Sequence, residues 1–376
     1  MAIGSASAVV IGGGVVGCAV AMELSRRGAE VTLLERNPAL ALEASGTSSG
    51  VLHTGFDSKP GELETELILR SAQIRGPLLD ALGVPVLRCG ATLAPSGDDE
   101  LAATDALEAN AHANGVEVRR GPNGELEVPG EYVTDPVACT YAWASAASGA
   151  GARIFLDTPA LSIDPDGDGI EVLTPGERLR ADIAVDCAGL HGGSFAEGGP
   201  AVKPRKGEFL VFEQPADPVE RVSLPVPDER TKGVLIFPTL DGHVGAGPTA
   251  VDQDDPTDWS VSDEGEALIR ERLATRHPGL AGAPTVFRYA GLRPAGVDCN
   301  YVIGASGTPG LITAAAIRST GLSASAGIGE YVAGLAAEMG LPLGEPAPVV
   351  AGPVPGPPPR SPWWRRTADF MAGKAP

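Results

Sequence analysis

The sequence AVVIGGGVVGC occupies residues 8–18, where an apolar run breaks into closely spaced glycines. Gly12 permits a tight turn after a strand, Gly14 lets the backbone approach a pyrophosphate, and Gly17 allows a helix to pack closely on the sheet. A second apolar run ends at Glu35, where a carboxylate binds ribose hydroxyls and repels a 2′-phosphate. The pattern therefore predicts a dinucleotide site at a helix N-terminus. The alternative is a glycine-rich turn that binds nothing.

Composition excludes several other classes of protein. The chain has 376 residues, 43% of them hydrophobic, and a formal net charge of −20, which disfavours binding to nucleic acid or to an anionic membrane. Its five cysteines are far apart and form no CxxC pair. That spacing argues against a metal site or a disulfide framework and favours a reducing cytoplasm. We expect neither a signal peptide nor a transmembrane segment, because no basic n-region and no run of about 18 apolar residues is present.

Hydrophobic periodicity and turn residues predict an α/β fold. The expected helices cover residues 18–28, 61–82, 98–114, 136–148, 262–276 and 322–338, with Asp135 as the N-cap of the fourth. The expected strands cover residues 8–11, 31–34, 90–94, 153–156, 170–173, 183–189, 286–292 and 311–316, with antiparallel strands at 208–212, 234–238 and 243–247.

These elements suggest two lobes and a tail. We expect a Rossmann-like dinucleotide-binding lobe, built from discontinuous segments, and a second lobe that holds a mixed, largely antiparallel sheet with helices. The ranges are 1–85, 150–200 and 285–340 for the first lobe, 86–149 and 201–284 for the second, and 341–376 for a proline-rich tail. Its composition predicts that this tail is extended or disordered and buries no core.

Several sequence blocks resemble FAD-dependent oxidoreductases of the D-amino-acid oxidase superfamily. The blocks are 44–55 with Asp57 and 59–61, 206–211, 237–239 with Gly245 and 247–249, 290–294, and 310–325. Within that superfamily the chain is most similar to L-2-hydroxyglutarate dehydrogenases and anaerobic-type glycerol-3-phosphate dehydrogenases. It departs from their pattern at Ser48, where Asn is usual, and at Thr54, where Ala is usual. No cysteine follows Cys299, so we expect no counterpart of the cysteine-rich C-terminal extension of some anaerobic relatives.

The resemblance implies FAD as the cofactor and assigns residues to it. The implied cofactor-binding residues are Gly12, Gly14, Val16, Gly17, Glu35, Arg36, Ser45, Ser48, Ser49, Gly50, Leu52, Ala188, Gly189, Thr320, Gly321, Leu322 and Ser323. Residues 320–323 would begin a helix whose free N–H groups stabilise the anionic reduced flavin. The alternative for this segment is a plain helix cap.

Two side chains stand out as chemical groups. His53 follows the predicted flavin loop, and imidazole is suited to accept a proton near neutrality. Arg293 offers a planar fork for a carboxylate or phosphate. Lys59, Arg205, Lys206 and Arg318 are weaker candidates for binding an anionic substrate. The alternatives are that His53 only hydrogen-bonds the flavin and that Arg293 forms a structural ion pair.

The predicted function is transfer of a hydride from a small hydroxy compound, a 2-hydroxy acid or a polyol phosphate, to FAD. An amino-acid or secondary-amine oxidase is the alternative among enzymes. A sensor or scaffold that binds the dinucleotide without turnover, with the proline-rich tail as a docking segment, is the alternative from another class. The motifs do not distinguish oxygen from a quinone as the electron acceptor.

Overall fold

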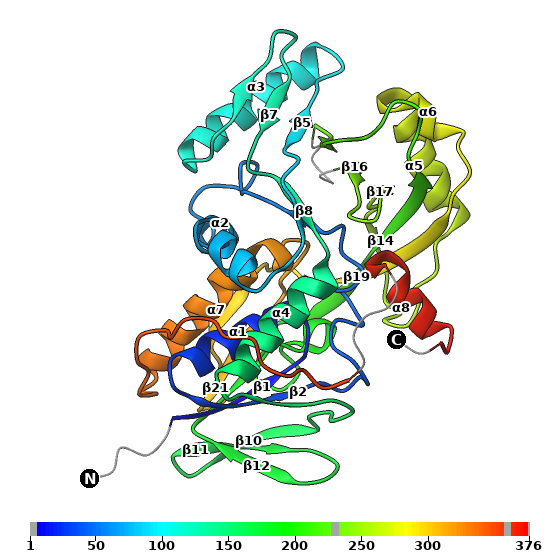
Figure 1. Ribbon diagram of the computed structural model, residues 1–376. Helices are drawn as coiled ribbons and strands as arrows, with labels where there is room; N and C mark the ends of the chain where they lie inside the picture. The colour runs from blue at the N-terminus through cyan, green and yellow to red at the C-terminus, as the bar shows by residue number, and fades with distance from the viewer. Residues whose placement is uncertain (1–5, 227–232, 357–361, 375–376) are drawn as a thin grey trace.

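The computed structural model describes residues 6–226, 233–356 and 362–374, and Figure 1 shows their arrangement. A six-stranded sheet of order β20-β21-β13-β1-β2-β9 forms the base of the dinucleotide fold, parallel except for the pair β20–β21. Its strands are β1 (Ser7–Ile11), β2 (Glu30–Leu34), β9 (Arg153–Phe155), β13 (Ile183–Asp186), β20 (Val302–Ala305) and β21 (Leu311–Ala315).

Both faces of this sheet are covered, which explains why its strands are apolar along their length. Because side chains alternate along a strand, Ala8 and Val10 enter the core with the helices, while Val9 and Ile11 enter a separate core on the opposite face. The helices are α1 (Val15–Arg26), α2 (Leu63–Ala81), α4 (Pro136–Gly149) and α7 (Gly321–Glu338). The opposite face carries a small sheet of β10 (Ser162–Asp166), β11 (Gly169–Leu173) and β12 (Arg178–Ala181).

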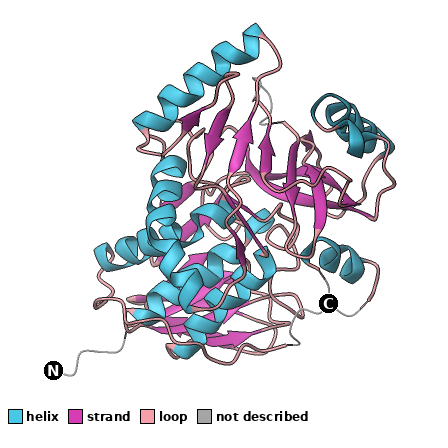
Figure 2. Cartoon of the chain, turned by 45° about the horizontal axis from the view of Figure 1, so that its top comes forward, coloured by secondary structure: helices cyan, strands magenta, loops and turns pink. Residues whose placement is uncertain are grey.

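A nine-stranded sheet forms the other half of the molecule, above the helix-rich half in Figure 2. Its longest strand is β14 (Val202–Glu213), which pairs antiparallel with β17, β18 and β19. The other strands are β5 (Ala91–Leu93), β6 (Arg119–Arg120), β7 (Leu126–Val128), β15 (Val222–Leu224), β16 (Leu235–Pro238), β17 (His243–Gly247), β18 (Val251–Asp252) and β19 (Phe287–Gly296). The helices of this half are α3 (Asp98–Ala113), α5 (Asp263–Arg276) and α6 (Pro278–Ala281).

A third small sheet links the two halves. It consists of β3 (Val51–Leu52), β8 (Tyr132–Thr134) and β4 (Val86–Leu87). Because β3 directly follows the loop 44–50, this sheet fixes the exit of that loop. A 3-10 turn, η1 (Gly189–His191), follows β13, and α8 (Trp363–Met371) is the last helix.

Most of the predicted elements are confirmed, including the antiparallel pairing of the strands between 208 and 247. Asp135 is the N-cap of α4 and accepts hydrogen bonds from the N–H groups of Val137 and Ala138, at 2.8 and 2.9 Å. Helix α1 begins at Val15, three residues earlier than predicted, so its first turn directly follows the glycine turn.

Two elements lie elsewhere than their sequence position suggested. Helix α4 falls in the range 86–149 but packs against α1, on the six-stranded sheet side. Strand β19 falls in the range 285–340 but pairs with β14 along ten residues. The positions of α4 and β19 depend on packing partners that are distant in sequence, and local sequence patterns do not reveal such partners.

The prediction that the proline-rich tail buries no core is wrong. Residues 341–354 form no helix or strand, but Leu341 is buried in the core of the six-stranded half. Helix α8 follows and packs on the body of the protein. Trp363 and Trp364 are only 2% and 4% exposed. The side chain of Arg366 is also buried and donates a hydrogen bond to the carbonyl of Leu40 at 2.9 Å. The composition of the segment did not indicate this burial, because its many prolines suggested an exposed tail. The two adjacent indoles supply enough apolar surface for the helix to pack.

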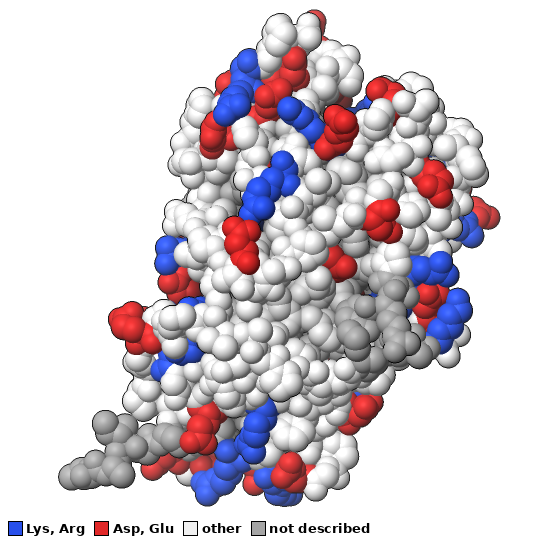
Figure 3. All heavy atoms as spheres, in the orientation of Figure 1, with Lys and Arg blue, Asp and Glu red and all other residues white. Residues whose placement is uncertain are grey.

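Among the described residues, no helix is long and apolar enough to cross a membrane. On the face drawn in Figure 3, acidic and basic side chains are interspersed instead of gathering into a single basic surface.

Candidate functional site

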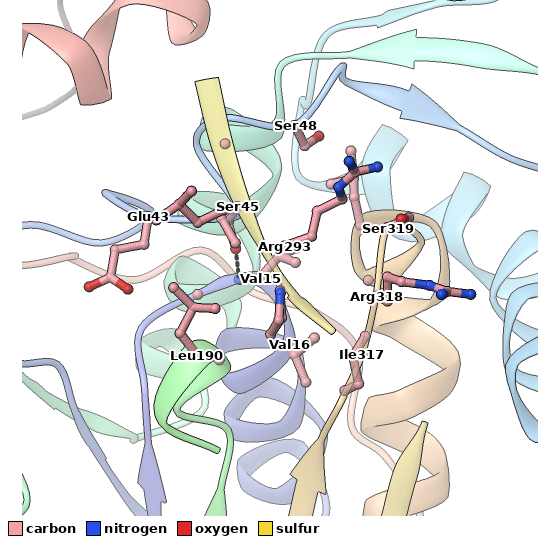
Figure 4. A pocket seen from close by; sticks show the side chains of 18 of the residues that line it. Val15, Val16, Glu43, Ser45, Ser48, Leu190, Arg293, Ile317, Arg318 and Ser319 are labelled. Carbon is pink, nitrogen blue, oxygen red and sulfur yellow. Dashed lines mark hydrogen bonds between the residues drawn. The ribbon is translucent and has the colours of Figure 1, made fainter. Parts of the chain in front are cut away.

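One large cavity of about 690 Å³ lies where the two large sheets meet. The glycine turn after β1, the loop 41–49, η1 and the start of α7 line it from the six-stranded half. Strands β14 and β19 line it from the nine-stranded half. Figure 4 shows Val15, Val16 and Ser45 close together in this cavity, with Arg293 and Arg318 extending to the side away from Glu43.

The glycine turn has no room for side chains. A Cβ on Gly12 would lie 2.4 Å from the carbonyl oxygen of Cys187, and a Cβ on Gly17 would lie 1.9 Å from the carbonyl oxygen of Gly12. Gly12 also has a φ of 107°, which only glycine adopts readily. The turn therefore presents bare backbone and the N-terminus of α1 to the cavity, the arrangement that accommodates a pyrophosphate.

Glu35 holds the turn as well as lining the cavity. Its carboxylate accepts hydrogen bonds from the N–H groups of Gly13 and Asn37, at 2.7 and 2.8 Å. Burial raises the pKa of Glu35, and these two donors act against that rise. Beside it, Arg36 contacts His191 of η1 at 2.7 Å. Burial and the charge of Arg36 lower the pKa of His191, so its ring is held neutral at this end of the cavity.

The loop before α7 carries backbone strain at the cavity wall. Ala316 and Ser319 have φ angles of 55° and 70° without being glycine, and both line the cavity. Such conformations persist where surrounding structure imposes them and are frequent at functional sites. The helix that follows places Gly321 and Leu322 at the cavity, as predicted.

Besides Arg36, three arginines line the cavity: Arg205, Arg293 and Arg318. Burial, and then the charges of the other two, lower the pKa of Arg293 to about 10. The guanidinium of Arg293 donates to the carbonyl of Thr249 at 2.6 Å and to those of Arg205 and Lys206 at 3.2 Å. A Cβ on Gly207 would lie 2.9 Å from Cβ of Pro248 and 3.2 Å from this guanidinium, so a side chain there would crowd both. Arg205 also pairs with Asp252, with its Nε 2.5 Å from one carboxylate oxygen and its Nη2 3.1 Å from the other. Part of its charge is therefore balanced, and Arg293 and Arg318 contribute most to the positive character of this part of the cavity.

His53 lines the same cavity, and its ring is held from behind. Its Nδ1 lies 2.9 Å from a carboxylate oxygen of Glu131, and its backbone N–H donates to the hydroxyl of Ser323 at 2.8 Å. The buried guanidinium of Arg75 donates to the carbonyl of His53 at 2.8 Å. The side chain is therefore fixed in orientation, with Nε2 left for a ligand.

The structure brings most of the predicted site residues to this cavity. Those that line it are Gly12, Gly14, Val16, Glu35, Arg36, Ser45, Ser48, Ser49, His53, Ala188, Gly189, Arg293, Arg318, Gly321 and Leu322, with Lys59 and Arg205.

Six predicted residues lie behind the cavity wall instead. These are Gly17, Gly50, Leu52, Lys206, Thr320 and Ser323. Lys206 is the clearest correction, because its ammonium pairs with Asp258 at 2.7 Å and is nearly buried. The hydroxyl of Thr320 is likewise engaged, with Glu64 at 2.7 Å and Tyr301 at 2.8 Å.

Sequence reasoning missed Glu131, Arg75 and Glu64. Glu131 stands in the short segment PGEY, which reads only as a turn, and Arg75 and Glu64 belong to a helix with no unusual motif. Their roles arise from contacts with residues distant in sequence. No local signal could have identified them.

The glycine turn and the N-terminus of α1 fit the pyrophosphate of a dinucleotide, and His53 and the arginines line the same cavity. The sequence model of the FAD dependent oxidoreductase family (DAO) matches residues 7–335. The chain belongs to this family, and FAD is its cofactor. The expected resemblance is thereby confirmed.

Known relatives support the narrower likeness. The glycerol 3-phosphate dehydrogenase of Caloramator mitchellensis is 28% identical over 345 residues, which cover 86% of this chain and 72% of that protein. The L-2-hydroxyglutarate dehydrogenase of Escherichia coli is 28% identical, covering 65% of this chain and 63% of its own. The fold matches that of L-alpha-glycerophosphate oxidase from Mycoplasma pneumoniae, solved with FAD bound, with a TM-score of 0.83 at 24% identity, covering 91% of this chain and 96% of that one.

Proposed function

We propose that the protein oxidises the hydroxyl group of a small anionic hydroxy compound, a 2-hydroxy acid or a polyol phosphate. The observation that carries the proposal is that His53 lines the same cavity as the glycine turn, together with Arg205, Arg293 and Arg318. One group suited to accept a proton and several groups suited to bind an anion thus share the space that the cofactor enters. The names of the relatives, which act on glycerol 3-phosphate and 2-hydroxyglutarate, support the same substrate class.

The cofactor would lie along the cavity from the adenosine end to the second sheet. Gly12, Gly14 and Val16 would hold its pyrophosphate, and Glu35 with Arg36 its adenosine. Serines and small residues would border the ribityl chain and the ring: Ser45, Ser48, Ser49, Ala188 and Gly189. When bound, FAD supplies the acceptor for the hydride. We further propose that the six-stranded half is the cofactor lobe and the nine-stranded half the substrate lobe.

The remaining chemistry falls to this chain's own side chains. Nε2 of His53 would take the hydroxyl proton as the hydride leaves the carbon. Arg293 and Arg318 would bind the phosphate or carboxylate and so place the hydroxyl beside His53, with Arg205, which pairs with Asp252, next to them. The five cysteines are unpaired, which supports the reducing cytoplasm as the compartment of this reaction.

The test is anaerobic bleaching of the bound flavin by a panel of compounds. We expect bleaching by glycerol 3-phosphate or by L-2-hydroxyglutarate, and none by glycerol or succinate, which lack the anion and the hydroxyl respectively. The two active arms distinguish a phosphate from a dicarboxylate substrate. Bleaching by amino acids or secondary amines alone would overturn the proposal in favour of an amine oxidase. A flavin that responds to no compound of the panel would point to a binding protein instead.

A further inference from the structure

A fully buried carboxylate lies behind His53. Glu131, in the turn between β7 and β8, is 0% exposed. One of its oxygens is 2.9 Å from Nδ1 of His53, and the other accepts hydrogen bonds from the N–H and the hydroxyl of Thr54, at 2.6 and 2.8 Å. The carboxylate therefore touches two consecutive residues of the segment that borders the cavity.

The surroundings balance the buried charge. Arg75 from α2 is 5% exposed, and the charge of Glu131 acts against the lowering of its pKa by burial. The guanidinium of Arg75 also donates hydrogen bonds to the carbonyls of Leu52, His53 and Ser323. A carboxylate on one side and a guanidinium on the other thus hold the backbone and the ring of His53.

We propose that Glu131 is a positioning residue that fixes the tautomer and the orientation of the His53 imidazole. An ionised carboxylate only accepts hydrogen bonds, so Nδ1 of His53 must carry the hydrogen that lies between them. Nε2 is then the unprotonated nitrogen, and it is the one left for the substrate hydroxyl. Thr54 holds the carboxylate itself, because it occupies the oxygen that His53 does not use. This inference rests on the proposed function only in naming the proton that His53 accepts.

The expected kinetic effect is large, because a base in the wrong tautomer cannot accept the proton. Replacing the orienting carboxylate by an amide costs up to about 10⁴-fold in serine proteases. For Glu131→Gln we expect flavin reduction to slow by at least about tenfold, with FAD retained and the half-saturating substrate concentration nearly unchanged. Glu330→Gln is the matched control, because Glu330 pairs with Arg70 on the outer surface and does not line the cavity.

A double-mutant cycle separates positioning from a merely structural role. The rate of flavin reduction is measured for His53→Asn and for His53→Asn combined with Glu131→Gln, using the compound that bleaches the wild-type flavin. If Glu131 acts through His53, the second substitution costs nothing further once His53 is gone. An equal loss in both backgrounds, or no loss in the wild-type background, would overturn the proposal.

A second readout needs neither turnover nor a Glu131 variant. Nitrogen NMR of the imidazole rings reports the tautomer of each neutral histidine, and the chain has only five histidines. The spectrum of His53→Asn identifies the signal of His53. We expect the tautomer with hydrogen on Nδ1, and the tautomer with hydrogen on Nε2 would overturn the proposal. This result does not depend on the substrate, so it distinguishes failure of this inference from failure of the proposed function.

Discussion

Replacing Trp363 by alanine tests whether α8 holds the loop 41–49, the proposed flavin loop. The indole is 2% exposed, and its Nε1–H donates to the carbonyl of Ser48 at 3.1 Å. Ser48 lines the cavity. The substitution therefore empties a buried site and releases one anchor of the loop at the same time.

The expected size of the effect follows from this burial. Truncation of a buried tryptophan to alanine costs about 3–5 kcal/mol. At about 2.1 cal/mol/K per residue, the unfolding entropy of 376 residues is about 0.8 kcal/mol/K, so Tm falls by about 4–6 °C. Loss of one hydrogen bond, about 1 kcal/mol, weakens FAD binding about fivefold.

The assay is thermal unfolding followed by the fluorescence of released flavin, together with the FAD found in the filtrate of a dilute sample. Met371→Ala is the control, because Met371 lies on the same helix and is 45% exposed; its Tm should change by less than about 1 °C. Should Trp363→Ala match this control in both Tm and FAD content, α8 would be no support for the flavin loop.

Three further outcomes are expected. Gly17→Ala abolishes FAD retention on gel filtration because its Cβ would lie 1.9 Å from a backbone oxygen, whereas Gly334→Ala, with open space around it, retains the cofactor. Arg318→Gln raises KM by about tenfold or more, as loss of a charged hydrogen bond does, while Lys206→Gln changes it less than twofold. The Lys206 ammonium lowers the pKa of Asp258 to about 2, so the ionised carboxylate stabilises the fold above about pH 4. This stabilisation is lost as pH falls from about 4 to 2, and the Tm of Asp258→Asn should decline less over that range.

The dinucleotide-binding half of the fold could be predicted from the sequence because the patterns that indicate it are local. A glycine turn between a strand and a helix, an N-cap such as Asp135 and apolar strands covered on both faces are all readable within about twenty residues. The same locality explains the success with the cavity residues near Gly12 and His53.

The features that the sequence did not reveal depend on contacts between residues that are distant along the chain. Lys206 looked available to a substrate until Asp258, fifty-two residues away, was found beside it. Nothing in the sequence around Glu131 indicates that the fold places it behind His53. Strand β19 lies in the range 285–340, which we expected in the dinucleotide-binding lobe, but it pairs with β14. Each of these features depends on contacts between distant segments, which hydrophobic periodicity does not encode.

The contact between Trp363 and Ser48 joins residues 315 positions apart. The two residues are therefore synthesised at different times. At about 5–20 residues per second of synthesis, about 15–60 s pass between the emergence of the flavin loop and that of the indole that anchors it. During that interval the loop can contact the glycine turn, but the hydrogen bond from Trp363 to Ser48 cannot yet form. The loop that contains Ser48 can therefore take its final position only after Trp363 has been synthesised.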